Sequence, residues 1–77
     1  MNRRTQRPAW SDYLRHARIS ADLTQRELAQ RVGVSNASIC YWEAGHAEPR
    51  RLHSALLTSV LALPAGELER LILEGAR

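Results

Sequence analysis

Hydrophobic residues along the chain follow the spacing of α-helices rather than that of β-strands. From Trp10 to Ala21 they recur at intervals of three and four, which gathers them on one helical face. The same kind of spacing returns in four later segments, residues 28–32, 39–42, 52–61 and 68–72. Alternation of apolar and polar residues never lasts long enough to predict a strand. The pattern therefore predicts an all-α fold, a compact domain of five short helices.

Capping residues indicate where the first two helices begin and end. Ser11 is a good N-cap with Asp12 in the following turn, and it predicts a first helix that runs to about residue 21. Thr24 and Glu27 form the capping-box pattern, in which each side chain accepts from the other residue's backbone N–H. Gly33 predicts the end of this second helix, because a left-handed residue after a helix is most often glycine.

The remaining boundaries follow from the same chemistry. Ser35 predicts the start of the third helix and Gly45 its end. Pro49 suits the first position of a fourth helix, and a fifth is expected after Gly66. We expect residues 1–9 to form a flexible basic tail and residues 10–77 to form the domain. The residues expected to turn inward are Leu52, Leu56, Leu57, Val60 and Leu61 in the fourth helix, and Leu68, Leu71 and Ile72 in the fifth.

The second and third helices are separated only by residues 33–35, so they must cross steeply. This is helix-turn-helix geometry, in which the second helix of the pair lies in a DNA major groove. By helical geometry the residues of the third helix fall on two opposite faces. The two faces are Ile39, Trp42 and Glu43, expected inside, and Asn36, Ala37, Cys40 and Tyr41, expected to meet base edges.

Composition and charge agree with a small domain that binds an anionic partner. Seventy-seven residues (8.7 kDa) allow one domain. All eleven basic residues are arginine, and residues 1–35 hold seven of them against three acids, which leaves that half at +4. Arginine suits phosphate because its planar guanidinium donates hydrogen bonds in pairs. The basic first half and the pI near 10.0 therefore indicate nucleic acid or another anionic surface.

Several other classes of protein do not fit the sequence. No apolar run approaches the roughly 20 residues of a membrane span, and residues 1–10 lack the apolar segment of a signal peptide. Cys40 is the single cysteine, so no internal disulfide can form and a reducing, cytoplasmic setting is expected. The acidic residues are scattered and no Gly-rich phosphate loop occurs, so we expect neither an enzyme nor a cofactor.

A further inference rests on residues spread over most of the chain. They are Leu14-Arg15, Arg18, Leu23-Thr24-Gln25, Glu27-Leu28-Ala29, Gly33-Val34-Ser35, Ile39, Trp42-Glu43, Gly45 and Pro49. In this spacing the chain resembles the Cro/repressor-like (XRE-type) helix-turn-helix family from about residue 14 to residue 73. The resemblance implies a five-helix, lambda-repressor-like domain that binds double-stranded operator DNA, usually as a two-fold dimer. It also implies the function of a dimeric repressor or autorepressor that reads a palindromic operator, located in the cytoplasm on the nucleoid.

The resemblance also implies DNA-contacting roles. Gln25 resembles the residue at the start of the second helix that touches a phosphate, and Arg50 resembles the basic residue directed at the minor groove. Because the base-facing positions hold no Arg, Lys or Gln, we expect Asn36 to bind adenine and much of the affinity to come from phosphates. The expected base contacts are Asn36, Ala37, Cys40 and Tyr41, and the expected backbone contacts are Gln25, Ser35, Arg26, Arg15 and Arg50.

Two further expectations concern how the domain is held together and how it pairs. Arg18 and Glu43 resemble the family's partly buried ion pair, which links the first helix to the third. Family members commonly carry a Leu-Ala pair where this chain has Leu56-Leu57, which widens the apolar face of the fourth helix here. We expect a homodimer formed through the C-terminal half, with an interface of Leu57, Leu61, Leu68 and Ile72.

Three groups of side chains admit a second interpretation. Zinc could be bound by Cys40, His46 and His53, and bases of a single strand could stack on Trp10, Tyr13 and Trp42. The tail could follow the DNA backbone through Arg3, Arg4 and Arg7. The zinc set lacks a fourth ligand at motif spacing, so no metal is expected. The tryptophans lie on apolar stripes, which favours the core, and the tail arginines either contact DNA or stay solvated. The lone cysteine is either a redox sensor or a small helical side chain.

A second function remains open beside DNA regulation. The base-facing positions offer few hydrogen-bonding side chains, and the apolar face of the fourth helix is wide. Both features also suit a protein-binding module of the same fold. Such a module would be an antitoxin or a bridging protein, with a toxin or RNA polymerase as its partner and DNA binding secondary. Among DNA regulators, a phage regulator, a restriction–modification controller and an operon autorepressor all fit the sequence.

Overall fold

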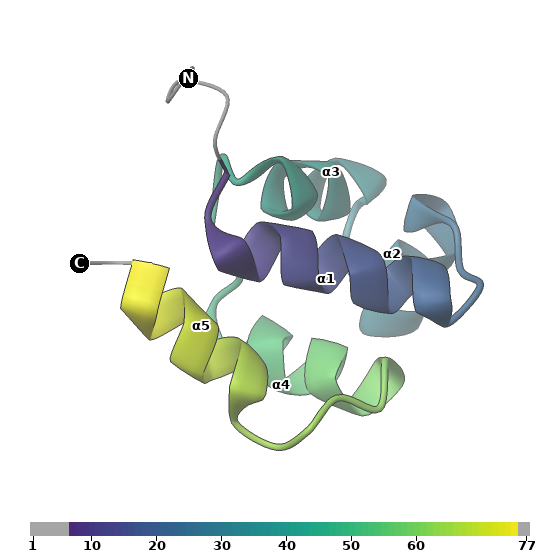
Figure 1. The fold of residues 1–77 in the computed structure, drawn as a ribbon. Coiled ribbons are helices and arrows are strands. Elements are labelled where there is room, and N and C mark those ends of the chain that lie inside the picture. Colours follow the sequence, from purple (N-terminus) through teal and green to yellow (C-terminus); the bar gives the residue numbers. More distant parts are fainter. Residues whose placement is uncertain (1–6, 76–77) are drawn as a thin grey trace.

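Five short helices form the greater part of the computed structural model, which describes residues 7–75 (Figure 1). No strand occurs among these residues, so the prediction of an all-α, five-helix domain is confirmed. The longest helix has 12 residues, and within residues 7–75 no helix is both long and apolar enough to cross a bilayer. The helices are α1 (Ala9–Ser20), α2 (Gln25–Val32), α3 (Asn36–Ala44), α4 (Arg51–Val60) and α5 (Glu67–Gly75).

The first helix begins earlier than its sequence predicts. Pro8 is the N-cap residue of α1, and Ser11, the predicted N-cap, lies fully buried in the first turn. The hydroxyl and the backbone N–H of Ser11 both donate to the Pro8 carbonyl oxygen, at 2.8 and 3.0 Å. Ser11 thus fixes the start of the helix from within it. Arg3 and Arg4, which belong to the expected tail, lie outside the described residues.

The second and third helices begin and end where capping chemistry predicts. Thr24 Oγ1 accepts from the Glu27 N–H at 3.0 Å, and Glu27 Oε1 accepts from the Thr24 N–H at 2.8 Å. The hydrogen bond from the Thr24 backbone N–H, together with the Thr24 side chain, lowers the pKa of the Glu27 carboxyl below its ordinary 4.5. Ser35 Oγ caps α3 by accepting from the Ser38 N–H at 3.1 Å. Gly33 and Gly45 end the two helices with positive φ angles of 87° and 78°.

The fourth helix starts two residues later than predicted, and this changes which side chains it buries. Pro49 lies buried in the preceding loop, Arg50 is the N-cap residue, and the helix begins at Arg51. Leu52, which we expected inside, falls in the first turn and is 68% exposed. Ser54, Leu57 and Leu61 instead occupy the inner face at helical spacing.

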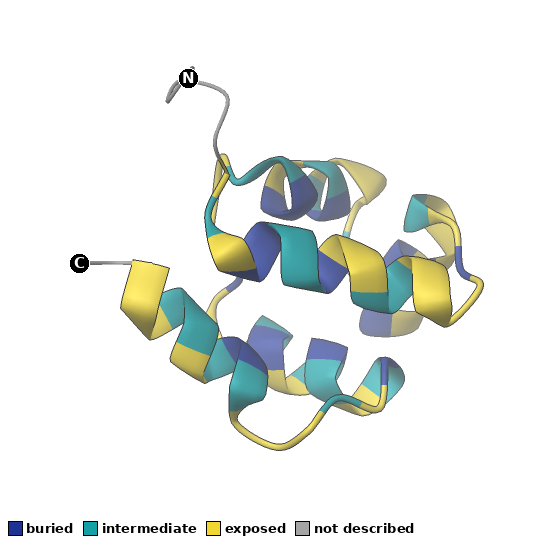
Figure 2. Ribbon diagram, viewed as in Figure 1, coloured by how far each residue is buried: buried dark blue, intermediate teal, exposed yellow. Residues whose placement is uncertain are grey.

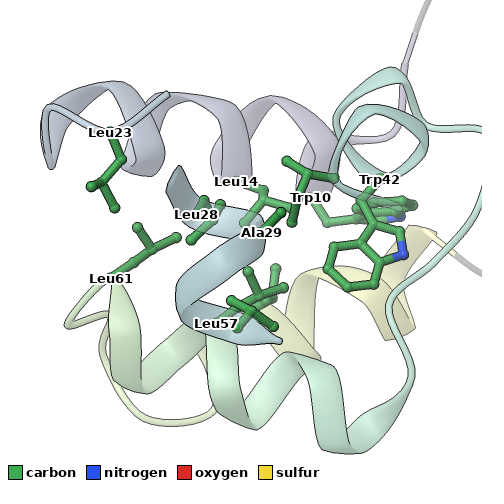
Figure 3. Close-up of a cluster of buried hydrophobic side chains, with 11 residues drawn as sticks. Trp10, Leu14, Leu23, Leu28, Ala29, Trp42, Leu57 and Leu61 are labelled. Atoms are coloured by element: carbon green, nitrogen blue, oxygen red, sulfur yellow. The ribbon is translucent and has the colours of Figure 1, made fainter. Parts of the chain in front are cut away.

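The α1 helix runs through the middle of the fold, with α3 on one side and α5 on the other (Figure 1). The α2 helix packs on both α3 and α4, and α4 packs on α5. Figure 3 shows Leu14, Leu28 and Leu57 meeting between α1, α2 and α4. Burial of each such side chain stabilises the fold by about 1.5–3 kcal/mol. The buried core is Trp10, Leu14, Leu23, Leu28, Ala29, Val32, Ile39, Trp42, Leu57, Leu61 and Leu68.

Burial settles several sequence interpretations. Trp10 and Trp42 are core residues, so they cannot serve as a stacking platform for single-stranded nucleic acid. Three of the four residues expected at a dimer interface also belong to the core of a single chain. Leu57 and Leu68 are fully buried and Leu61 nearly so, and only Ile72 keeps partial exposure. Of the Leu56-Leu57 pair in α4, Leu57 therefore lies in the core and Leu56 is half-buried.

The chain before α1 closes over the end of α3. A Cβ atom added at Gly45 would lie 2.6 Å from Pro8 Cδ, and Pro8 is held in place by Ser11. No other heavy atom would lie within 4 Å of a Cβ atom at Gly33. Both glycines need a positive φ, but Gly45 also needs the absence of a side chain.

We expect Gly45→Ala to destabilise the domain more than Gly33→Ala. A left-handed alanine costs about 1–2 kcal/mol at either position, whereas overpacking against Pro8 adds about 1–3 kcal/mol only at Gly45. Urea unfolding monitored by tryptophan fluorescence measures both. Equal losses in the two variants would show that the Pro8 contact contributes nothing.

Candidate nucleic-acid interface

The α3 helix separates its side chains into a buried and an open face, as the sequence predicts. Ile39, Trp42 and Glu43 are buried, and Figure 2 shows the buried part of α3 turned toward α1. Asn36 and Ala37 are exposed on the opposite side, and Tyr41 is 56% exposed. The three-residue turn after α2 and the capped start of α3 hold this open face in a fixed direction.

Cys40 differs from the other residues of the predicted base-facing set. Its side chain is half-buried, and its Sγ donates to Gln25 Oε1 at 3.1 Å. Asn36, Ala37 and Tyr41 are open, whereas Cys40 is turned toward the first residue of α2. The predicted set therefore contains two kinds of residue, three on the open surface and one in a contact between helices.

Three helices meet at the carboxylate of Glu43. Its Oε2 accepts from Arg18 Nε at 2.6 Å, and its Oε1 accepts from Arg18 Nη2 at 3.0 Å, so the ion pair is bidentate. The same Oε1 also accepts from Gln25 Nε2 at 3.1 Å. Arg18 Nη1 donates further to the Leu23 carbonyl oxygen at 2.8 Å. We call these side chains, Arg18, Gln25 and Glu43, the polar junction.

The ion pair of the polar junction is shielded from water, as the resemblance to the family implies. The exposed fractions of the two side chains are 13% for Arg18 and 3% for Glu43. The hydrogen bond to Glu43 raises the pKa of Arg18, against the opposing effect of burial. The guanidinium therefore stays charged and holds the α3 helix to α1 rather than facing a ligand.

The three arginines of the predicted backbone set are exposed, each on a different helix or helix end. Arg15 is exposed on α1, Arg26 in the first turn of α2, and Arg50 at the N-cap of α4. Gln25 is half-buried in the polar junction, and the Ser35 hydroxyl oxygen accepts the capping hydrogen bond while its O–H remains a donor. The exposed arginine side chains can therefore reach a phosphate, whereas the side chain of Gln25 is held in place by hydrogen bonds.

Tyr13 and His53 are half-buried, whereas His46 is exposed. Tyr13 has Glu67 and Arg70 of α5 nearby, and burial above all raises its pKa. The His46 and Tyr41 rings form an edge-to-face pair with centroids 6.4 Å apart, and the His53 ring lies tilted by 41° against Trp42 at 5.3 Å. Within residues 7–75 no three His, Cys, Asp or Glu side chains are grouped closely enough to hold a metal ion.

Sequence reasoning found the Arg18–Glu43 pair but missed its extension to Gln25 and Cys40. Both added hydrogen bonds join residues 15 or 18 positions apart, on different helices. Their formation depends on the crossing of α2 and α3, which no local pattern specifies. The signals available in the sequence were Gln25 at the start of α2 and Cys40 on α3. The resemblance implied a phosphate contact for Gln25, and Cys40 was expected to contact a base.

We expect Arg18→Met to destabilise the domain by about 3–5 kcal/mol, because the Glu43 carboxylate would stay buried without its charged partner. The double variant Arg18→Met/Glu43→Leu removes both charges and should recover much of this loss. Arg70→Met, which removes the surface ion pairs with Glu67 and Glu74 on α5, serves as the control and should change the unfolding midpoint little. Similar midpoints for Arg18→Met and Arg70→Met would contradict a structural role for the buried pair.

The geometry agrees with comparison to known proteins. The family model described as helix-turn-helix matches residues 14–68, more than half of the chain. No curated protein and no solved structure matches the chain significantly. The matched residues run from α1 into α5 and include the whole polar junction and the open face of α3. The chain belongs to the XRE-type helix-turn-helix family of DNA-binding transcription regulators.

Proposed function

We propose that this protein is a sequence-specific transcriptional repressor that binds a palindromic operator as a two-fold dimer, with α3 in the major groove. One observation carries the proposal: α3 buries Ile39, Trp42 and Glu43 and leaves Asn36, Ala37 and Tyr41 open. A recognition helix needs this division, because one face must anchor the helix while the other meets base edges. A dimer seated on a promoter represses by excluding RNA polymerase, in the compartment that holds the DNA.

The open face of α3 favours recognition of A·T base pairs. Asn36 can donate to and accept from one adenine at the same time, which gives about 1–3 kcal/mol of discrimination. Ala37 and the ring of Tyr41 offer apolar surface to thymine methyl groups. None of these three side chains grips guanine in the bidentate way that arginine does. Part of the specificity then comes from Arg50 reading the width of the minor groove.

Affinity comes mainly from the phosphate backbone in this proposal. Arg15, Arg26 and Arg50 are exposed, and the N-terminal half of the chain carries a net +4. Each arginine that neutralises a phosphate releases counterions, so binding weakens as salt concentration rises. Gln25 and Ser35 contribute neutral contacts at the starts of α2 and α3.

The surface proposed for dimerisation moves from the buried leucines to the outer side of α4 and α5. A groove of about 300 Å³ lies there, and Leu73 on its border is 70% exposed. Glu69 Oε1 is buried in this region without a hydrogen-bond partner among the described residues. A hydrogen-bond donor from a second copy related by two-fold symmetry would satisfy this oxygen. The groove is lined by Glu48, Pro49, Arg50, Arg51, Ser54, Glu69, Ile72 and Leu73.

The exposure of Leu52 and Leu73 also supports the second candidate function, a protein-binding module. Both leucines are more than two-thirds exposed on the side of the domain formed by α4 and α5. An antitoxin or bridging protein would use this surface for its partner and bind DNA without sequence preference. Selection of bound duplexes from a random pool by the purified chain separates the two functions, because only a repressor recovers a symmetric motif.

We expect Asn36→Ala to weaken binding to the selected duplex by about five- to a hundredfold, and Tyr41→Ala to weaken it further in combination. Because both side chains are neutral, the dependence of affinity on salt should not change. Arg26→Gln should instead weaken binding to all sequences and reduce the salt slope by about 0.9. Glu74→Gln on α5 is the control and should bind as the unmodified chain does. Unchanged sequence preference in Asn36→Ala would refute readout by α3.

We expect Leu73→Asp to raise the dissociation constant of the dimer by at least about tenfold, since it removes apolar surface from the contact. Sedimentation equilibrium measures this constant. Ile19→Asp is a matched control, because Ile19 is also exposed (52%) but lies at the end of α1. Equal dissociation constants in both variants would remove the α4–α5 surface from the proposal.

Operator half-sites should lie about 34–36 Å apart, centre to centre.

A further inference from the structure

The side-chain amide of Gln25 is held between two hydrogen-bond partners on α3. Cys40 Sγ donates to its oxygen at 3.1 Å, and its nitrogen donates to Glu43 Oε1 at 3.1 Å. Cys40 and Glu43 are three positions apart on α3, so both face the start of α2 where Gln25 lies. The amide is therefore fixed at both ends by one neighbouring helix.

The chemistry of the partners dictates the orientation of the amide. An ionised carboxylate only accepts hydrogen bonds, so Gln25 must turn its NH₂ group toward Glu43. The amide oxygen then faces residue 40, and only a donor at that position can satisfy it. The thiol of Cys40 is such a donor. The polar junction thus continues from Arg18 through Glu43 and Gln25 to Cys40.

This orientation determines what Gln25 presents to its surroundings. An amide nitrogen carries two N–H groups, and the hydrogen bonds of the described residues use one of them, toward Glu43. The second N–H remains available at the first residue of α2, beside the open face of α3. A rotated amide would present its oxygen there instead, and an oxygen repels a phosphate.

We infer that Cys40 is a positioning residue for DNA binding, which acts by fixing the Gln25 amide with an N–H toward a DNA phosphate. This inference rests on the proposed function. It replaces the sequence-based expectation that Cys40 contacts a base directly. Cys40 then contributes to affinity on every DNA sequence alike, because a phosphate contact carries no sequence information.

The test is a double-mutant cycle of residues 40 and 25, measured on the duplex that the unmodified chain selects. Cys40→Ala removes the donor and should weaken binding about two- to tenfold, the effect of one neutral hydrogen bond. Cys40→Ser retains a donor and should stay within about twofold of the unmodified chain. In the Gln25→Ala background, Cys40→Ala should have no further effect.

Two additional readouts separate a positioning role from other roles. A duplex with an altered half-site should lose the same factor on Cys40→Ala, whereas a base contact would change the preference between the two duplexes. The NMR signals of the Gln25 side-chain NH₂ in the free protein should shift in Cys40→Ala and less in Cys40→Ser. Thermal unfolding confirms that each variant is folded.

The outcomes distinguish this inference from the proposed function. If the unmodified chain binds no duplex, the proposed function fails and the inference fails with it. If the chain binds its duplex but Cys40→Ala weakens binding equally with Gln25 and with Ala at position 25, only the inference is overturned. Full binding by Cys40→Ala overturns it as well.

Discussion

The arrangement of the domain depends on one buried carboxylate, that of Glu43. It accepts hydrogen bonds from Arg18 on α1 and from Gln25 on α2 while it belongs to α3 itself. A buried charge is tolerated only where it is paired and hydrogen-bonded, so these helices have few ways to pack around it. Hydrophobic burial stabilises the fold, but apolar contacts alone tolerate small changes of angle. The carboxylate makes the crossing of α1, α2 and α3 specific.

Because α3 is held through its buried face, the side chains on its outer face are not needed to stabilise the fold. Asn36, Ala37 and Tyr41 take part in no side-chain hydrogen bond among the described residues, and the core does not need them. Related sequences can therefore change these positions without altering how the helix is held. In the proposed function, recognition and stability reside on opposite sides of the same nine-residue helix. The contact between Cys40 and Gln25 is where the two sides meet.

Local chemistry in the sequence was enough to predict most of the fold. The capping box of Thr24 and Glu27, and the glycines at 33 and 45, depend on neighbours within a few residues, so their roles can be inferred without tertiary information. Errors arose where a tertiary contact decided the outcome. Ser11 is buried beneath Pro8 instead of capping α1, and Leu57 is taken up by the core instead of a dimer interface.

The candidate site was predictable to the same extent and for the same reason. Helical periodicity alone separates the buried and open faces of α3, and the resemblance to the family supplied the pair of Arg18 and Glu43. The contact of Cys40 with Gln25 could not be inferred, because Gln25 lies on another helix and the distance between the two side chains depends on a crossing angle. Polar contacts between helices are the part of the site that only the three-dimensional structure reveals.

The packing of α5 against the first turn of α1 has a consequence for the order of folding during synthesis. A Cβ atom at Gly75 would lie 3.2 Å from Trp10 Cδ1, so the last turn of α5 covers a tryptophan near the start of the chain. Leu68 enters the same core. On the ribosome, α1 to α3 emerge before the helix that shields this indole from water. The indole of Trp10 therefore lacks the cover of α5 until that helix has been synthesised and has left the ribosome.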